Sequence, residues 1–172
     1  VISLNDIKPS TVDGTFYYSS LLSFFKGLNC VTTVLGKVGF TQEQARDLSL
    51  VVEPKVTFHT DYEHQSDNIH SDQKNNFFTV TLQIYLPDDD SIKEYGTQFY
   101  NSKNEKIYKT DFIPNSGYLM LSNNNAWHKS INGVYRQSLL VRYNIPFDLF
   151  TALPFGHHDC EDGIFPIVFN RN

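Results

Sequence analysis

Residues 77–86, with the sequence FFTVTLQIYL, are the most regular stretch of the chain. Successive side chains of a β-strand point to opposite faces, so this alternation of apolar and polar residues predicts a strand. One face suits a hydrophobic core, and the polar, aromatic-tipped face suits the wall of a cavity inside a β-barrel or jelly roll. The apolar face comprises Phe78, Val80, Leu82, Ile84 and Leu86, and the polar face comprises Thr79, Thr81, Gln83 and Tyr85.

Shorter stretches of β-type sequence lie on both sides of this strand. Residues 55–62 (KVTFHTDY) alternate in the same way. The 14 Phe and 10 Tyr residues also favour strands. Together these signals predict a mainly β fold of the sandwich or jelly-roll type. Further strands are predicted at 96–100, 118–122, 126–128 and 134–144, with residues 101–109 as a polar excursion between strands.

Residues 1–54 carry helical signals instead. Apolar residues in 17–28 (YYSSLLSFFKGL) recur near helical spacing. Thr41 and Gln44 have the spacing of a capping box that opens a short helix, and Pro54 prevents its continuation. We therefore expect a few N-terminal helices packed on one face of a sheet.

The 172 residues fit one domain with a sizeable core, and no linker or internal repeat interrupts them. We divide this domain into a scaffold (1–54), a β core (55–145) and a C-terminal extension (146–172). With a net charge of -5, the chain lacks the positive surface charge that general binding to nucleic acid needs.

No apolar run approaches the ~20 residues of a membrane-spanning helix. No signal-peptide pattern is visible either, although the chain begins at Val1 rather than at a methionine. Cys30 and Cys160 lie far apart and in no metal-binding spacing, which is typical of reduced thiols. We therefore expect a cytoplasmic protein without a membrane segment.

A candidate metal site lies in residues 69–72 (IHSD), immediately before the regular strand. On a strand, His70 and Asp72 point to the same face. With one further histidine they would form the two-His, one-carboxylate triad that is typical of non-haem Fe(II) oxygenases. His59 and Asp61 repeat the His-x-Asp spacing. We interpret this second copy as a solvated strand face, because no strand ending in Tyr-Leu follows it directly.

The order of these signals over residues 55–145 resembles the Fe(II)- and 2-oxoglutarate-dependent dioxygenase superfamily, in particular its prolyl-hydroxylase-like branch. The interval from the distal histidine to the arginine, 136 − 128 = 8 positions, is shorter than in most of that family. The strand that begins at Gly96-Thr97 also has a single glycine where many members of that family have two. The matching elements, in order, are His70-Ser71-Asp72, Ile84-Tyr85-Leu86, Gly96-Thr97, the segment from Gly117 to His128, and Arg136-Gln137-Ser138.

The resemblance implies a double-stranded β-helix, the cupin-like form of the jelly roll. It implies that His70, Asp72 and His128 hold one Fe(II) ion and form the catalytic centre. The co-substrates would be 2-oxoglutarate and O2, and the substrate either a protein side chain such as proline or a small metabolite. The family positions that bind 2-oxoglutarate correspond here to Arg136, Ser138, Tyr85 and, less directly, Tyr62.

Some residue assignments stay open. Arg142 has the same strand parity as Arg136 and could replace it, and Tyr85 could be a plain core aromatic. A two-residue turn at Asn132-Gly133 would place Arg136 on the opposite face from His128. A three-residue loop over 131–133 would pair the two residues, and the metal-site interpretation requires this loop.

Two other functions remain as alternatives. One is a non-enzymatic jelly-roll module whose aromatic side chains bind carbohydrate. The other is a cupin-type metalloenzyme without 2-oxoglutarate, which is disfavoured because no His-x-His and Glu ligand set surrounds His70. The run from His157 to Cys160 is interpreted as a tail, with a substrate lid as its alternative.

Overall fold

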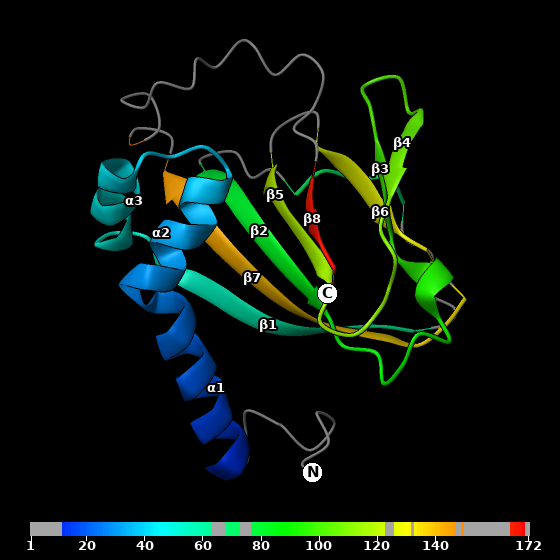
Figure 1. Cartoon of the computed structure of the whole chain (residues 1–172), viewed down its shortest axis with the longest axis horizontal. Helices are drawn as coiled ribbons and strands as arrows, with labels where there is room; N and C mark the ends of the chain where they lie inside the picture. Colours follow the sequence, from blue (N-terminus) through cyan, green and yellow to red (C-terminus); the bar gives the residue numbers. More distant parts are fainter. Residues whose placement is uncertain are drawn as a thin grey trace.

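The computed structural model describes residues 12–62, 68–72, 77–122, 126–131, 133–146, 149 and 166–170. Helices occupy the N-terminal part and lie on one side of the large sheet (Figure 1). Antiparallel strands make up most of the remainder, so the mainly β prediction is confirmed. The helices are α1 (Val12–Lys26), α2 (Leu28–Lys37) and α3 (Gln42–Ser49), and a short 3-10 turn, η2, covers Lys93–Tyr95.

The larger sheet has five strands in the order β1-β7-β2-β5-β8. The regular stretch of the sequence forms β2, which lies at the centre and pairs with both β7 and β5. The C-terminal extension contributes the last strand, which pairs with β5. The bounds are β1 Pro54–Asp61, β2 Phe77–Tyr85, β5 Gly117–Ser122, β7 Arg136–Pro146 and β8 Ile167–Phe169.

The smaller sheet has the order β4-β3-β6, with β3 at Thr97–Tyr100, β4 at Lys106–Lys109 and β6 at Trp127–Ser130. His70 extends this sheet, because its backbone forms an antiparallel bridge with His128. The two sheets stand opposite each other (Figure 1). The polar face of β2 lies on the side of the smaller sheet, because Gln83 lines one cavity together with His128 and Ser130.

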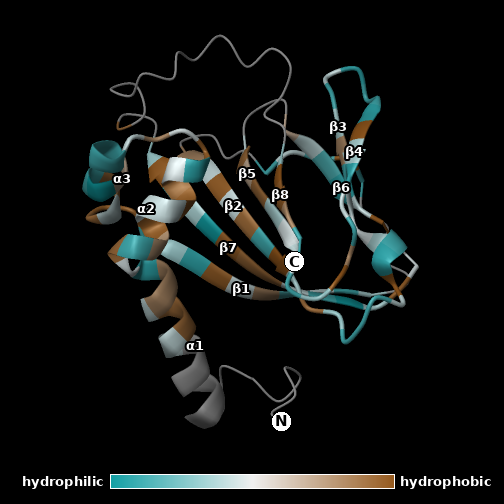
Figure 2. Cartoon of the chain, in the orientation of Figure 1, coloured by the Kyte–Doolittle hydropathy of each residue, from teal (hydrophilic) through white to brown (hydrophobic). Residues whose placement is uncertain are grey.

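The main hydrophobic core lies between the helices and the larger sheet (Figure 2). The apolar face of β2 packs here, as its alternation predicted. Leu35 of α2 and Val141 of β7 are fully buried in this core. A second cluster lies between the two sheets and consists of Tyr85, Phe99, Phe112, Tyr118, Met120 and Ala126.

Local signals explain the helix ends. The predicted capping box is present at α3, where the Thr41 side chain accepts from the Gln44 backbone and the Gln44 side chain accepts from the Thr41 backbone. The helix expected over residues 17–28 forms as α1 up to Lys26, and Gly27 separates it from α2, which begins at Leu28. None of the described helices is long and apolar enough to cross a membrane.

The predicted pairing of His128 with Arg136 is wrong. Strand β6 pairs with β3, so His128 lies opposite Phe99, whereas Arg136 begins β7 and lies opposite Asp61 of β1. The chain between β6 and β7 crosses from one sheet to the other instead of closing a hairpin. Gly133 still adopts a positive φ of 113° in this crossing, a conformation that glycine tolerates well.

One segment outside the main strands differs from expectation, and another is not described. The polar excursion at 101–109 contains β4, whose residues are mostly exposed and therefore lack an apolar periodicity. The interval from His157 to Cys160 lies outside the described residues. The division of the chain at residue 146 is approximate, because β8 belongs to the larger sheet.

Candidate metal centre and its cavity

His70, Asp72 and His128 come together although 58 positions separate the two histidines (128 − 70 = 58). Each offers one ligand atom, and these atoms all lie within 4.8 Å of one another. The backbone bridge between His70 and His128 brings their rings to a centroid distance of 4.6 Å. Asp72 follows two residues after His70 and completes the group, as the sequence predicted.

Both imidazole rings are oriented by backbone carbonyls. His70 Nδ1 lies 2.8 Å from the Asn68 oxygen, and His128 Nδ1 lies 3.0 Å from the Ala126 oxygen. A carbonyl only accepts hydrogen bonds, so both Nδ1 atoms carry the proton and a neutral ring has its lone pair on Nε2. Such a second bond fixes the tautomer of a metal-binding histidine.

The Nε2 atoms face the carboxylate of Asp72. His70 Nε2 lies 4.0 Å from Oδ1, and His128 Nε2 lies 3.9 Å from Oδ2. Ligand bonds of about 2.1 Å at right angles would place neighbouring donors about 3.0 Å apart. The two histidine–carboxylate distances therefore suit one divalent ion after a contraction of roughly an ångström, and all three ligand atoms already lie within 4.8 Å of one another.

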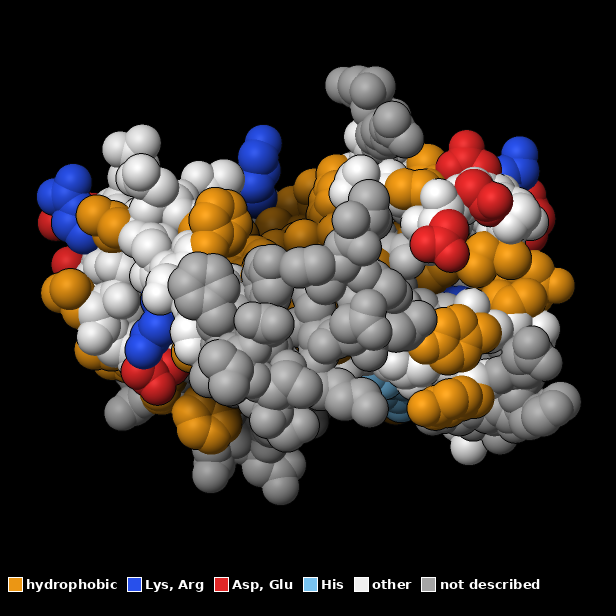
Figure 3. Space-filling view, turned by 90° about the horizontal axis from the view of Figure 1, so that it is seen from below, with side chains coloured by type: hydrophobic (Ala, Val, Ile, Leu, Met, Phe, Trp, Pro, Cys, Tyr) orange, Lys and Arg blue, Asp and Glu red, His pale blue; other side chains and the backbone are white. Residues whose placement is uncertain are grey.

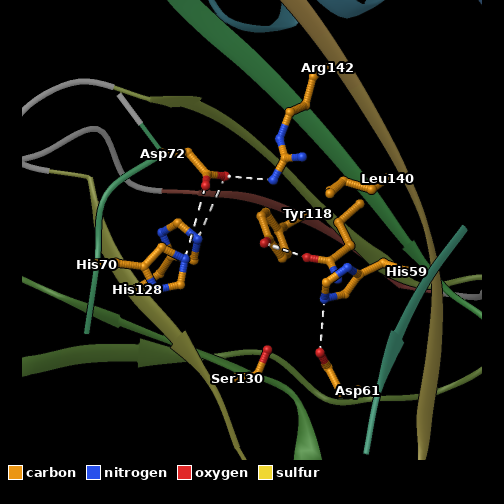
Figure 4. Close-up of a pocket in the computed structure, with 10 residues that line it drawn as sticks. His59, Asp61, His70, Asp72, Tyr118, His128, Ser130, Leu140 and Arg142 are labelled. Atoms are coloured by element: carbon orange, nitrogen blue, oxygen red, sulfur yellow. Dashed lines mark hydrogen bonds and ion pairs between the residues drawn. The ribbon is translucent and has the colours of Figure 1, made fainter. Parts of the chain in front are cut away.

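The triad borders a polar cavity of about 130 Å³. In Figure 4 the triad stands on one side, and His59 and Asp61 stand on the other. Arg142 of β7 reaches into this cavity, and its Nη2 lies 3.4 Å from Asp72 Oδ2. The lining residues are His59, Asp61, His70, Asp72, Gln83, Tyr118, His128, Ser130, Leu140 and Arg142.

Hydrogen bonds order the wall formed by the larger sheet. The Gln83 amide donates to Ser138 Oγ at 2.8 Å, and the Tyr118 hydroxyl donates to the Gln83 carbonyl oxygen. Burial, together with the negative charge of Asp72, raises the pKa of Tyr118 well above its usual value. Tyr118 therefore stays protonated and acts as a neutral donor in this wall.

Arg136 shares the cavity-facing side of β7 with Leu140 and Arg142 but lies deeper, with only 2% of its surface exposed. Its guanidinium carbon lies 4.7 Å from the ring centre of Phe112 and 5.8 Å from that of Tyr85. Nε and Nη2 have no hydrogen-bond partner among the described residues. A buried cation with two unsatisfied nitrogens is suited to an anion.

The other predicted co-substrate residues differ in their placement. Ser138 and Tyr85 are buried on the same wall as Arg136. Tyr85 is fully buried, and its hydroxyl bonds to two threonine side chains, so it also fits the plain core alternative. Tyr62 lies just beyond β1 with 64% of its surface exposed, and its ring contacts Tyr135 rather than the cavity.

The interpretation of His59 and Asp61 as a solvated strand face holds only in part: both residues line the cavity, and 43% of the His59 side chain but only 15% of the Asp61 side chain is exposed. His59 Nε2 donates to Asp61 Oδ1 at 2.8 Å, and this bond raises the pKa of His59. Burial alone would raise the pKa of Asp61, but the His59 bond and the charge of Arg136 outweigh it and the pKa is lowered.

Strand parity was the signal that could have found this pair. Val56 of β1 is buried in the main core, and Phe58 packs against that core from the same face. His59 and Asp61 alternate with these residues and must point toward the smaller sheet. Sequence reasoning also missed Tyr118 and Ser130, which neither a motif nor a resemblance marks.

Comparison with known proteins gives no relative for this arrangement: no family model, no curated protein and no solved structure matches the chain.

Proposed function

We propose that the protein is a non-haem Fe(II)- and 2-oxoglutarate-dependent oxygenase that hydroxylates an unactivated C–H bond and releases succinate and CO2. The observation that carries the proposal is the convergence of His70, Asp72 and His128 within 4.8 Å. Two histidines and one carboxylate on one side of an ion are the donor set of this enzyme class, and they leave positions open on the other side.

The strand connections support a double-stranded β-helix. Passing along the chain, β1, β2, β5 and β7 belong to the larger sheet, and the segments between them belong to the smaller one. The His70 segment, β3 with β4, and β6 are these intervening segments. Such regular alternation between two facing antiparallel sheets is the winding of a jelly roll.

The described side chains would have separate roles in binding the metal. His70, His128 and Asp72 would hold the iron, and the two backbone carbonyls on Nδ1 would keep the imidazoles in place. Bound iron would supply the O2-dependent oxidation, which the side chains cannot perform. Arg142 would orient the Asp72 carboxylate through its 3.4 Å contact.

Arg136 would bind the far carboxylate of 2-oxoglutarate. Its planar fork matches a carboxylate, and its two unsatisfied nitrogens supply the donors. Ser138 and Tyr85 adjoin the same wall and would complete the polar surroundings. Arg142 remains the alternative anchor, because it lines the cavity directly.

The test is aerobic conversion of 2-oxoglutarate to succinate by the Fe(II)-loaded protein, screened with proline-containing peptides and small metabolites. The matched control is Asp72→Ala, which removes a ligand while both histidines stay in place. We expect succinate from the wild type and background levels from the variant. Equal turnover by both proteins, or failure of the wild type to bind Fe(II), would reject the proposal.

A second candidate is a non-enzymatic module that binds carbohydrate. Tyr62 and Tyr135 favour it, because they are 64% and 44% exposed and their ring centres lie 6.1 Å apart. Figure 3 shows, on the right of the view, hydrophobic side chains beside a histidine that reaches the surface. Titration with soluble oligosaccharides, using Tyr62→Ala as the control, separates this function from the oxygenase.

A further inference from the structure

Asp61 lies between the imidazole of His59 and the guanidinium of Arg136 but is hydrogen-bonded to only one of them. Its Oδ1 accepts a hydrogen bond from His59 at 2.8 Å. Its Oδ2 lies 3.7 Å from Nε of Arg136, which is an ion-pair distance but too long for a hydrogen bond. A hydrogen bond from Ser130 also lowers the pKa of Asp61. The carboxylate is therefore held on the side of His59.

This arrangement determines which guanidinium nitrogens of Arg136 can still donate a hydrogen bond to a ligand. Nη1 points to the backbone oxygens of Gly96 and Ile131 at 3.4 and 3.5 Å. Nε and Nη2 make no hydrogen bond within the described part of the chain, although the residue is almost completely buried. The carboxylate of Asp61 forms an ion pair with this guanidinium.

We propose that His59 is a positioning residue that holds Asp61 off Arg136 and so keeps the guanidinium available for the carboxylate of the co-substrate. This inference rests on the proposed function. Without the His59 bond, a shift of Asp61 by less than an ångström would form a charge-assisted hydrogen bond to Nε. Asp61 would then occupy the donor that 2-oxoglutarate needs.

The charges around His59 agree with this role. On its own strand it faces Asp61, and on β7 it faces Arg136 and Arg142, whose positive charges lower the pKa of His59. The hydrogen bond to Asp61 outweighs burial and these two charges, so the net pKa of His59 is raised. Across the cavity stand the triad residues and the neutral hydroxyl of Tyr118: His70, Asp72, His128 and Tyr118.

The test measures binding of 2-oxoglutarate to the full chain loaded with Mn(II), by anaerobic calorimetry. His59→Leu removes the hydrogen bond, whereas His59→Gln keeps an amide donor at a similar distance. Thr60→Leu is the matched control, since it changes the neighbouring position on the opposite face of β1. We expect the dissociation constant to rise about tenfold in His59→Leu, the effect of about 1.4 kcal/mol, and to stay within about threefold in His59→Gln.

Removing the competing carboxylate gives the decisive comparison. Asp61→Asn should bind 2-oxoglutarate at least as tightly as the wild type, and His59→Leu combined with Asp61→Asn should recover that affinity. Thermal unfolding establishes that each variant is folded, and His59→Asn, whose shorter amide does not reach Asp61, replaces His59→Leu if needed.

The outcomes distinguish this inference from the proposed function. If the wild type binds 2-oxoglutarate and His59→Leu binds it equally well, the positioning role is rejected and the oxygenase proposal stands. A double variant that stays as weak as His59→Leu also rejects the role, because the defect is then not caused by Asp61. If the Mn(II)-loaded wild type binds no 2-oxoglutarate, both proposals fail.

Discussion

His70 and His128 exchange both of their backbone hydrogen bonds, with N–O distances of 3.0 and 2.9 Å. Residues paired in this way on antiparallel strands project their side chains to the same face, side by side. The two imidazoles are therefore brought together by the smaller sheet itself rather than by flexible loops. A site built on paired strands keeps its geometry better than one built on loops.

Metal binding should depend on His70 and not on His59. We expect His70→Ala to weaken Mn(II) or Fe(II) binding by roughly 100-fold or more. Even the loss of a residue that only hydrogen-bonds a metal ligand typically lowers metal affinity by about 10–100-fold. His59→Ala should retain the metal, because His59 stands on the opposite side of the cavity (Figure 4). Calorimetric metal titration of both variants checks this. Loss of metal in His59→Ala with retention in His70→Ala would mean that the metal binds at His59 and Asp61 instead.

Arg136→Lys should impair the co-substrate rather than the metal. A lysine cannot reproduce the two-pronged contact, so the KM for 2-oxoglutarate should rise roughly ten- to a hundredfold, the effect of about 1.5–3 kcal/mol. Iron affinity should change little, because Arg136 is not a ligand. Steady-state kinetics and metal titration measure the two effects separately.

Arg142→Lys is the control for that experiment. Arg142 contacts Asp72, so its replacement should lower metal affinity more than it affects the KM for 2-oxoglutarate. If the KM defect appears in Arg142→Lys and is absent from Arg136→Lys, the co-substrate carboxylate binds at Arg142.

The pair of His59 and Asp61 should make stability depend on pH. The pKa of His59 is raised above 6.5, so its contribution is complete below that pH and is lost as the pH rises through the folded-state pKa. The pKa of Asp61 is lowered below 3.8, so its contribution is present above that pH and is lost as the pH falls through the folded-state pKa. The free energy of unfolding of the wild type relative to His59→Gln should therefore be largest at mildly acidic pH.

Urea unfolding at about pH 5, 6.5 and 8 measures this difference. The advantage of the wild type should shrink at the highest pH, because the contribution of a raised pKa is lost as the pH rises above the ordinary value of the group. An advantage that is equally large at the highest and the middle pH would show that the charged pair does not contribute to folding.

The helix layer should matter for stability more than for the metal site. Leu35 of α2 is fully buried, so Leu35→Ala should lower the free energy of unfolding by about 2–5 kcal/mol. Leu50→Ala is the control, since 82% of Leu50 is exposed and such changes usually stay within about 0.5 kcal/mol. Urea unfolding compares the two. A similar effect of both variants would mean that the helices do not pack on the sheet as described.

Regular local patterns carried the successful predictions. The alternation in β2 defined both of its faces, and the spacing of Thr41 and Gln44 defined the start of α3. His70 and Asp72 could be paired because they are two residues apart on one segment, whereas His128 was chosen from the order of motifs in the resemblance. These features depend on neighbours in sequence, which a single chain displays directly.

The failures concern which segments pair across the molecule. The Asn132-Gly133 signal identifies a turn, but it does not show whether the next strand returns to the same sheet or crosses to the other. The pairing partners of β6 and β7 are set by packing of the two sheets. For the same reason the sequence did not place His59 and Asp61 opposite the triad, although their parity was visible.

Strand β8 covers the outer edge of β5, a strand whose six residues are all buried. An uncovered strand edge presents a row of unpaired amide and carbonyl groups that a second chain can extend. Because β8 is the last strand of this sheet, it replaces the six-residue edge of β5 with an edge of three residues, which offers less backbone for intermolecular strand pairing. Proteolytic removal of this short segment would first be seen as self-association of an otherwise folded protein.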